Sequence, residues 1–162
     1  PAQTGSHGPA YYSKYPKEFV YFTPVCDTVQ VSSCSQEALD NAYDNTIRYT
    51  DSLIADLIAQ LDALSDVNAA LIYVSDHGQS LGENGFYLHG APTAIAPKAQ
   101  REVQFFVWIS EGFAQARDLT PQSILRQETH PHDFPFHSVM GAFGLRSEIY
   151  KPEFDIFNNY EQ

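Results

Sequence analysis

Two residues with metal-binding side chains, Asp76 and His77, directly follow an apolar run of the sequence. A carboxylate oxygen and an imidazole nitrogen both bind zinc, at about 2.0–2.2 Å. Gly78 comes next, and a glycine lets the backbone turn sharply and approach a ligand closely. Because a catalytic zinc site needs at least three protein ligands and a structural site needs four, this pair requires further ligands from elsewhere.

An isolated Asp-His-Gly also has an ordinary structural explanation. Asp76 can cap the following turn and His77 can be a surface histidine, since short motifs often match by chance. A further histidine, His89, stands twelve residues after His77. If residues 82–85 form a compact loop, His89 returns to the same place and can contribute to one site.

The elements that must position these side chains can be predicted from periodicity. Residues 69–75 form a short, nearly unbroken apolar run, typical of a strand covered on both faces. Before them, Ser33 or Ser35 can cap a long helix without glycine or proline. The apolar residues of this covering helix are Leu39, Tyr43, Ile47, Ile54, Leu57, Leu61 and Leu64. A helix followed by a strand is the order of a parallel crossover, and ligands gather at the carboxyl ends of such strands.

Further elements are indicated on either side of this unit. Residues 104–110 and 18–22 are strand candidates, and Pro92 and Pro97 mark residues 91–98 as a loop beside the site. A short helix with an apolar face is expected near the C-terminal end, and residues from Pro152 onward indicate an irregular tail. The apolar residues of that short helix are Phe134, Phe136, Val139, Met140 and Phe143.

Composition limits the classes of function. The formal net charge of -11 argues against a nucleic-acid partner and gives no general attraction to an anionic membrane. No apolar run approaches the roughly 18–20 residues of a membrane span, and no signal peptide is visible. The length of 162 residues is compatible with one domain, and 43% hydrophobic residues can fill its core.

Two other polar segments favour structural roles. His130, His132 and His137 cluster near the C-terminal end, but Pro131 and Pro135 break the spacing of a metal tract. We expect these three histidines to pack or to cap a helix. The segment 41–45 is expected to serve packing and surface hydrogen bonding.

Taken together, the motifs resemble the lipid A phosphoethanolamine transferases. These enzymes belong to the sulfatase-like branch of the alkaline phosphatase superfamily and include the mobile enzymes of colistin and other polymyxin resistance. The resemblance covers most of the chain in the family's order and spacing. The matching segments are Gly5–Pro9 with Tyr11 and Tyr12, Phe22–Cys26, Asn41–Asn45, Tyr73–Gly85, Tyr87–Gly90, His132–Asp133 and Phe136–Val139.

The resemblance implies an α/β fold, a three-layer sandwich with a central, mostly parallel sheet flanked by helices, of which this chain is a part. It places Asp76 and His77 on the family's adjacent zinc ligands. It places His7 and His89 on catalytic histidines that line the phosphate site, bind substrate or help to hold a second metal. The family's nucleophilic threonine, a ligand glutamate and the transmembrane helices lie N-terminal to residue 1.

The implied function is zinc-dependent transfer of phosphoethanolamine from phosphatidylethanolamine to a lipid A phosphate through a phosphothreonine. Residues 1–162 would then be the C-terminal part of a periplasmic domain anchored in the inner membrane, inactive alone, and of unknown oligomeric state. A related metal-dependent sulfatase or phosphodiesterase is an alternative. A non-catalytic metal-binding module is another.

Two positions depart from the family pattern. Gln79 stands where the family usually has a glutamate, which removes a charge next to the metal ligands. Ala2 stands where the family commonly has a histidine, five residues before His7.

Cys26 and Cys34 are the only cysteines, and seven residues separate them. As a zinc pair they lack the short spacing of two to four residues, so a disulfide that closes a small loop is favoured and matches the family's cysteine spacing. Such a bridge implies an oxidising compartment. Two reduced, buried thiols are the alternative.

Overall fold

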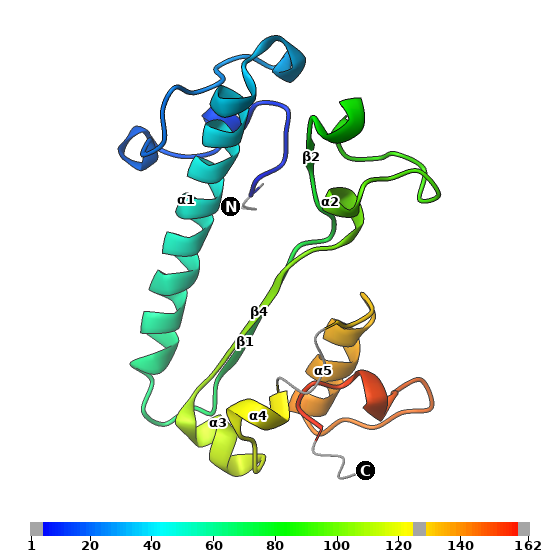
Figure 1. The fold of residues 1–162 in the computed structure, drawn as a ribbon. Helices are drawn as coiled ribbons and strands as arrows, with labels where there is room; N and C mark the ends of the chain where they lie inside the picture. The colour runs from blue at the N-terminus through cyan, green and yellow to red at the C-terminus, as the bar shows by residue number, and fades with distance from the viewer. Residues whose placement is uncertain (1–4, 125–128, 159–162) are drawn as a thin grey trace. The chain divides into compact units, whose positions relative to one another are not determined.

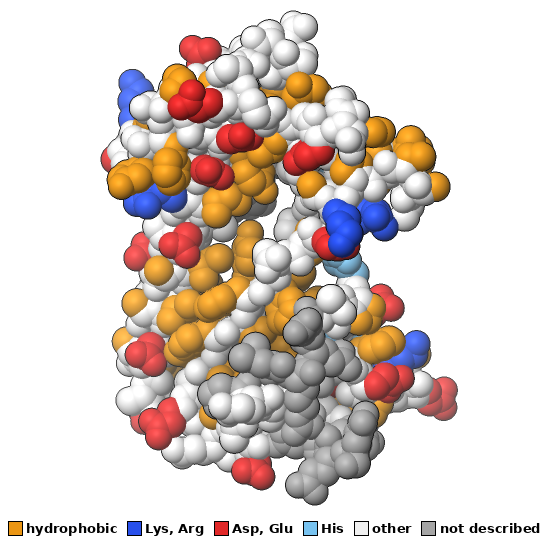
Figure 2. All heavy atoms as spheres, in the orientation of Figure 1, with side chains coloured by type: hydrophobic (Ala, Val, Ile, Leu, Met, Phe, Trp, Pro, Cys, Tyr) orange, Lys and Arg blue, Asp and Glu red, His pale blue; other side chains and the backbone are white. Residues whose placement is uncertain are grey.

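The computed structural model describes residues 5–124 and 129–158, and the chain divides into two compact units. The first unit comprises residues 1–59 and 75–104, and the second comprises residues 60–74 and 105–162. Figure 1 shows the course of the chain through both. Acidic side chains spread over the visible face in Figure 2, in keeping with the negative net charge. All residues of the predicted site lie in the first unit.

The predicted long helix is α1, Gln36–Asp62. It begins where a serine cap was expected, because the hydroxyl of Ser35 accepts a hydrogen bond from the backbone N–H of Ala38 at 3.2 Å. Its N-terminal turns pack into a core of buried residues: Tyr11, Cys26, Val31, Ala38, Leu39 and Ala42. Farther along, Ile47 and Leu57 are exposed, so the helix buries its beginning more completely than its full apolar stripe predicts.

The structure contains the Cys26–Cys34 disulfide, which confirms that prediction. The bridge encloses a loop with the 3-10 helix η3, Val31–Ser33. The Cys26 side chain is only 3% exposed, and its backbone N–H donates to the carbonyl of Ala38 at 2.9 Å. The disulfide therefore ties this loop to the start of α1.

Loss of the disulfide is expected to lower the free energy of unfolding by about 2–3 kcal/mol, the entropy of closing so short a loop in the unfolded chain. Urea denaturation with and without reductant measures this difference. The variant with both Cys26→Ala and Cys34→Ala is the control, because it has no bridge left to reduce. Equal stability of the oxidised and reduced chains would contradict the expectation.

Asn45 explains why residues 18–22 form no strand, contrary to the prediction. Its buried amide oxygen accepts hydrogen bonds from the backbone N–H groups of Tyr21 and Phe22, both at 2.9 Å, and its amide nitrogen donates to the carbonyl of Phe22 at 3.0 Å. These backbone groups are thus paired with a side chain instead of a neighbouring strand. Residues Lys17–Phe19 form the 3-10 helix η2. The packing role expected for segment 41–45 is confirmed.

The remaining elements of the first unit are short. They are η1 (Tyr11–Ser13), β2 (Ser80–Leu81), η4 (Glu83–Gly85), β3 (Tyr87–Leu88) and α2 (Lys98–Arg101). Strands β2 and β3 pair antiparallel. The turn between them includes Gly82 and Gly85 at positive φ angles of 126° and 79°, a conformation that favours glycine. This is the compact loop predicted at residues 82–85.

In the second unit, both apolar runs form strands as predicted, β1 (Ala70–Val74) and β4 (Phe105–Ile109). They pair antiparallel, with Ile72 opposite Val107, so this pair differs from the parallel neighbours that the helix-then-strand order indicated. Mixed sheets are common in α/β folds, so an antiparallel pair is compatible with the predicted fold class. Only one face of the β1–β4 pair packs on the core of the second unit. On the other face, Tyr73 and Phe106 are 38% and 43% exposed.

Helices α3 (Glu111–Ala116), α4 (Pro121–Ile124), α5 (Phe134–Ala142) and the 3-10 helix η5 (Pro152–Phe154) complete the second unit. Helix α5 is the predicted short helix. The segment after Pro152 is irregular apart from η5, but Ile156 and Phe157 are buried, so it is a packed part of the core and not a loose tail.

His130 and His137 of the second unit serve packing, as the broken spacing predicted, whereas His132 is exposed. The Nδ1 atom of His137 accepts a hydrogen bond from the backbone N–H of Lys151 at 3.1 Å. The His130 ring lies against the rings of Phe105 and Phe134.

Candidate metal centre

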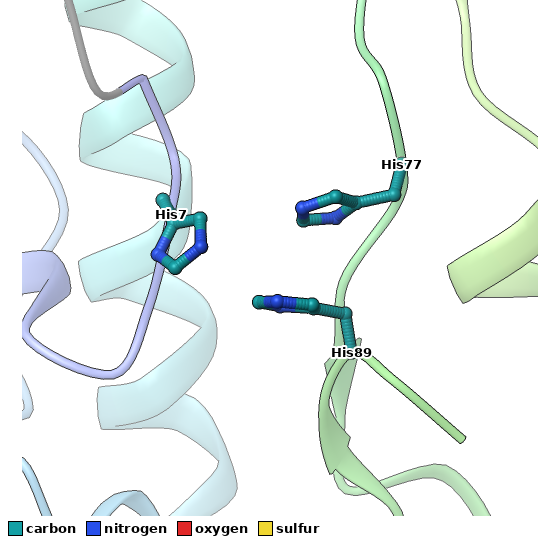
Figure 3. A group of neighbouring side chains, drawn as sticks. All are labelled: His7, His77 and His89. Carbon is teal, nitrogen blue, oxygen red and sulfur yellow. The ribbon is translucent and has the colours of Figure 1, made fainter.

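Three histidines from separate segments gather in the first unit: His7, His77 and His89 (Figure 3). His7 precedes η1, His77 lies three residues after β1, and His89 directly follows β3. One ring nitrogen of each lies within 4.8 Å of the others. The His77 and His89 rings stack, with centroids 4.0 Å apart, while His7 meets both rings edge-on. The structure thus brings together three of the four histidine and aspartate residues that the sequence singled out.

The Nδ1 atom of each histidine faces a hydrogen-bond acceptor. In His7 the acceptor is the carbonyl of Gly8 at 2.8 Å, and in His77 it is the carbonyl of Gly78 at 3.0 Å. In His89 it is the side-chain oxygen of Gln79 at 3.4 Å. Because a carbonyl oxygen only accepts, the proton of a neutral ring lies on Nδ1, and Nε2 keeps a free lone pair. Metal-binding histidines typically have this arrangement.

Asp76 lies at the edge of this group. Its side chain is 90% exposed, and its carboxylate accepts a hydrogen bond from the backbone N–H of His77 at 3.1 Å. The carboxylate oxygen is 3.9 Å from Nε2 of His77. Two donor atoms on one tetrahedral zinc ion are on the order of 3.3 Å apart, so a small rotation of this exposed side chain would bring both within reach of one ion.

Gly78 packs closely against α2, a role that the sequence did not predict. The backbone N–H of Gly78 donates to the carbonyl of Gln100 at 3.1 Å. A Cβ atom at position 78 would lie 1.8 Å from the carbonyl oxygen of Ala99. The glycine is therefore required for close packing against α2, and its predicted approach to a ligand stays a prediction.

Gln100 anchors both sides of the site. Its side-chain nitrogen donates to the hydroxyl of Ser80 at 3.0 Å, and its side-chain oxygen accepts from the backbone N–H of Ala91 at 3.2 Å. Helix α2 thus holds the segment after His77 and the start of the 91–98 loop in one place. Sequence patterns carried no signal for this role, because it depends on contacts between residues far apart in the chain.

A pocket of about 310 Å³ opens beside the histidines, and residues of the predicted 91–98 loop line it. It is lined by His77, His89, Gly90, Ala91, Thr93, Ala96, Gln100 and Arg101. Arg101 brings a cation to the pocket, and its Nε–H donates to the carbonyl of Ala96 at 3.1 Å. A guanidinium is well suited to bind phosphate oxygens.

The electrostatics favour a neutral His89 ring. The pKa of the His89 ring is lowered by its partial desolvation among its neighbours, and further by the adjacent His77 and His7 rings, while Asp76 opposes the shift. His89 as a whole residue remains exposed. Since only the neutral ring can bind a metal ion, the lowered pKa keeps His89 in the ligand form near pH 7.

The sequence model of the sulfatase family matches residues 2–145. The chain belongs to the sulfatase family. This assignment confirms the resemblance predicted from the motifs and the sulfatase-like α/β fold class.

Among curated relatives, this sulfatase-family chain is 42% identical over 157 residues to phosphoethanolamine transferase EptA of Salmonella typhimurium. The alignment covers 94% of the chain and 28% of that relative, so the chain spans less than a third of its length. Within the part of the chain that the structure describes, no helix is long and apolar enough to cross a membrane.

Solved structures agree with this assignment. The C-terminal periplasmic domain of phosphoethanolamine transferase EptC from Campylobacter jejuni is 41% identical, with a TM-score of 0.86, over 96% of this chain and 49% of that one. The integral membrane lipooligosaccharide phosphoethanolamine transferase EptA from Neisseria meningitidis is also 41% identical, with a TM-score of 0.89. That comparison covers 94% of this chain and 29% of the transferase.

Proposed function

We propose that this chain forms part of the metal centre of an enzyme that transfers phosphoethanolamine to a phosphate group of lipid A. The observation that carries the proposal is the convergence of three imidazoles whose Nδ1 atoms all face acceptors. The similarity to phosphoethanolamine transferases supports the choice of reaction.

The donor set fits zinc. His77 and His89 would offer Nε2 to an ion, and Asp76 would add an oxygen ligand, a combination that zinc commonly accepts. A bound zinc ion would supply Lewis-acid stabilisation of the negative charge on the transferred phosphate. His7 approaches the other two rings from the opposite side in Figure 3, where it can complete the ligand set or contact the phosphate.

The chain's other residues would act on the substrate. Arg101 lines the same pocket and would bind phosphate oxygens, and a protonated His7 would donate a hydrogen bond to them. In this proposal phosphatidylethanolamine is the donor, and the nucleophilic threonine that carries the phosphoethanolamine belongs to the rest of the protein. The disulfide and the similarity to periplasmic domains support a place in the periplasm of a membrane-anchored enzyme.

A hybrid enzyme tests this function. Residues 1–162 would replace the matching part of Salmonella typhimurium EptA in cells that lack their own EptA, and lipid A would be analysed by mass spectrometry. We expect lipid A that carries added phosphoethanolamine. Hydrolysis of phosphatidylethanolamine without a modified acceptor would instead favour a phosphodiesterase. A hybrid that accumulates in the membrane but has neither activity would contradict the proposal.

A further inference from the structure

Gln79 stands where the family usually has a glutamate, and it is buried between Tyr11 and His89. Its side chain is 8% exposed. Its Oε1 atom lies 3.5 Å from the hydroxyl of Tyr11 and 3.4 Å from Nδ1 of His89. Its Nε2 atom is buried and has no hydrogen-bond partner among the described residues. The amide therefore directs its oxygen, and not its nitrogen, toward both neighbours.

This orientation determines which nitrogen of His89 carries the proton. With the amide oxygen 3.4 Å from Nδ1, the tautomer that donates from Nδ1 is favoured, and in that tautomer the Nε2 lone pair stays free. If the amide turned over, its NH₂ group would face Nδ1, and the ring proton would move to Nε2. That arrangement would block the nitrogen that a metal ion needs.

Tyr11 is compatible with the first orientation. Its side chain is 1% exposed, and burial raises its pKa above the ordinary value, as do the neighbouring Tyr43 and Glu83. Tyr11 therefore keeps its hydroxyl proton and can donate it to the oxygen of Gln79. The two donors, Tyr11 and His89, then share one acceptor.

The other two histidines have no such dependence on a side chain. The Nδ1 atoms of His7 and His77 face backbone carbonyls, which cannot exchange an oxygen for a nitrogen. Only the His89 ring faces a side chain, that of Gln79, whose chemistry a substitution can change. A carboxylate at position 79 would offer only acceptors, an amide offers both orientations, and an apolar side chain offers neither.

We propose that Gln79 is a positioning residue that holds His89 in the tautomer with the proton on Nδ1 and so presents Nε2 to the metal centre. The benefit to metal binding rests on the proposed function, but the tautomer itself does not. The contacts of 3.4 and 3.5 Å are long for hydrogen bonds, so Gln79 biases the tautomer equilibrium without eliminating the other form.

Nitrogen NMR of the metal-free chain tests the tautomer directly. Histidine ring nitrogens labelled with ¹⁵N would be observed near pH 8, about 1.5 units above the ordinary histidine pKa, and His89 would be assigned with His89→Ala. We expect the Nδ1–H pattern for His7, His77 and His89 in the native chain. In Gln79→Met, which keeps the length but lacks the amide, the His89 signals should shift toward the Nε2–H form that a free histidine favours in water.

His7 and His77 serve as internal controls in the same spectra, because their patterns should not change. Gln79→Glu is the matched variant, and it should preserve the Nδ1–H form of His89. A His89 ring with its proton on Nε2 in the native chain would overturn the proposal. The proposal would also be overturned if Gln79→Met left the His89 signals unchanged while the signals of His7 and His77 showed an intact site.

Zinc affinity separates this proposal from the proposed function. Gln79→Met should weaken zinc binding about 10- to 100-fold, the usual effect of removing a partner of a metal-binding histidine, and Gln79→Glu should not weaken it. If the native chain shows the expected tautomers but binds no zinc, the metal function fails and the role of Gln79 in the tautomer stands.

Discussion

Replacing His77 with alanine is expected to weaken zinc binding by this chain at least about 100-fold. Loss of a hydrogen-bond partner of a metal ligand typically costs 10- to 100-fold in affinity, and loss of the ligand itself costs at least as much. His77 is the common neighbour in the site, since its ring stacks on His89 and its Nε2 lies 3.9 Å from the Asp76 carboxylate. In the hybrid enzyme, the same substitution should reduce lipid A modification below detection.

Competition with a chromophoric zinc chelator measures the affinity. His132→Ala is the matched control, because His132 is an exposed histidine in the second unit, and it should bind zinc as the native chain does. Circular dichroism of each variant reports whether it folds. Zinc affinity equal to that of the native chain in a folded His77→Ala variant would exclude His77 as a ligand.

Gly78→Ala is expected to have the largest effect on the structure of the site. The new Cβ atom would lie 1.8 Å from the carbonyl oxygen of Ala99 and 2.9 Å from its carbonyl carbon. These are backbone atoms and cannot rotate away, so the segment after His77 must separate from α2. Overpacking of this kind costs about 1–3 kcal/mol, and separation would also break the hydrogen bond from Gly78 to Gln100. We expect lower stability and weaker zinc binding together.

Urea denaturation and zinc titration measure the two effects of Gly78→Ala. Gly85→Ala is a useful control, because a Cβ atom there meets nothing within 4 Å and the cost is limited to the strain of a positive φ. That variant should lose some stability but bind zinc normally when folded. Native zinc affinity and stability in Gly78→Ala would show that the contact with Ala99 relaxes at no cost.

Local patterns in the sequence determined the elements around the site. The serine cap and the apolar spacing of α1, the apolar runs of β1 and β4, and the glycine-rich turn between β2 and β3 are all properties of neighbouring residues. Such properties are decided by short-range hydrogen bonding and by which faces are apolar. The motifs along the chain, taken together, showed the resemblance to the family, and the spacing of the two cysteines favoured the disulfide.

Only the tertiary structure decided how distant segments meet. The antiparallel pairing of β1 with β4 and the capture of Tyr21 and Phe22 by Asn45 depend on partners that no local pattern specifies. The same holds for the contact of Gly78 with Ala99 and for the place of Gln79 between Tyr11 and His89. Asp76, His77 and His89 were recognisable in the sequence as candidate residues. The orientation that the rings of His7, His77 and His89 share, with Nδ1 of each against an acceptor, arises only in the folded chain. Packing there places one particular oxygen beside each ring.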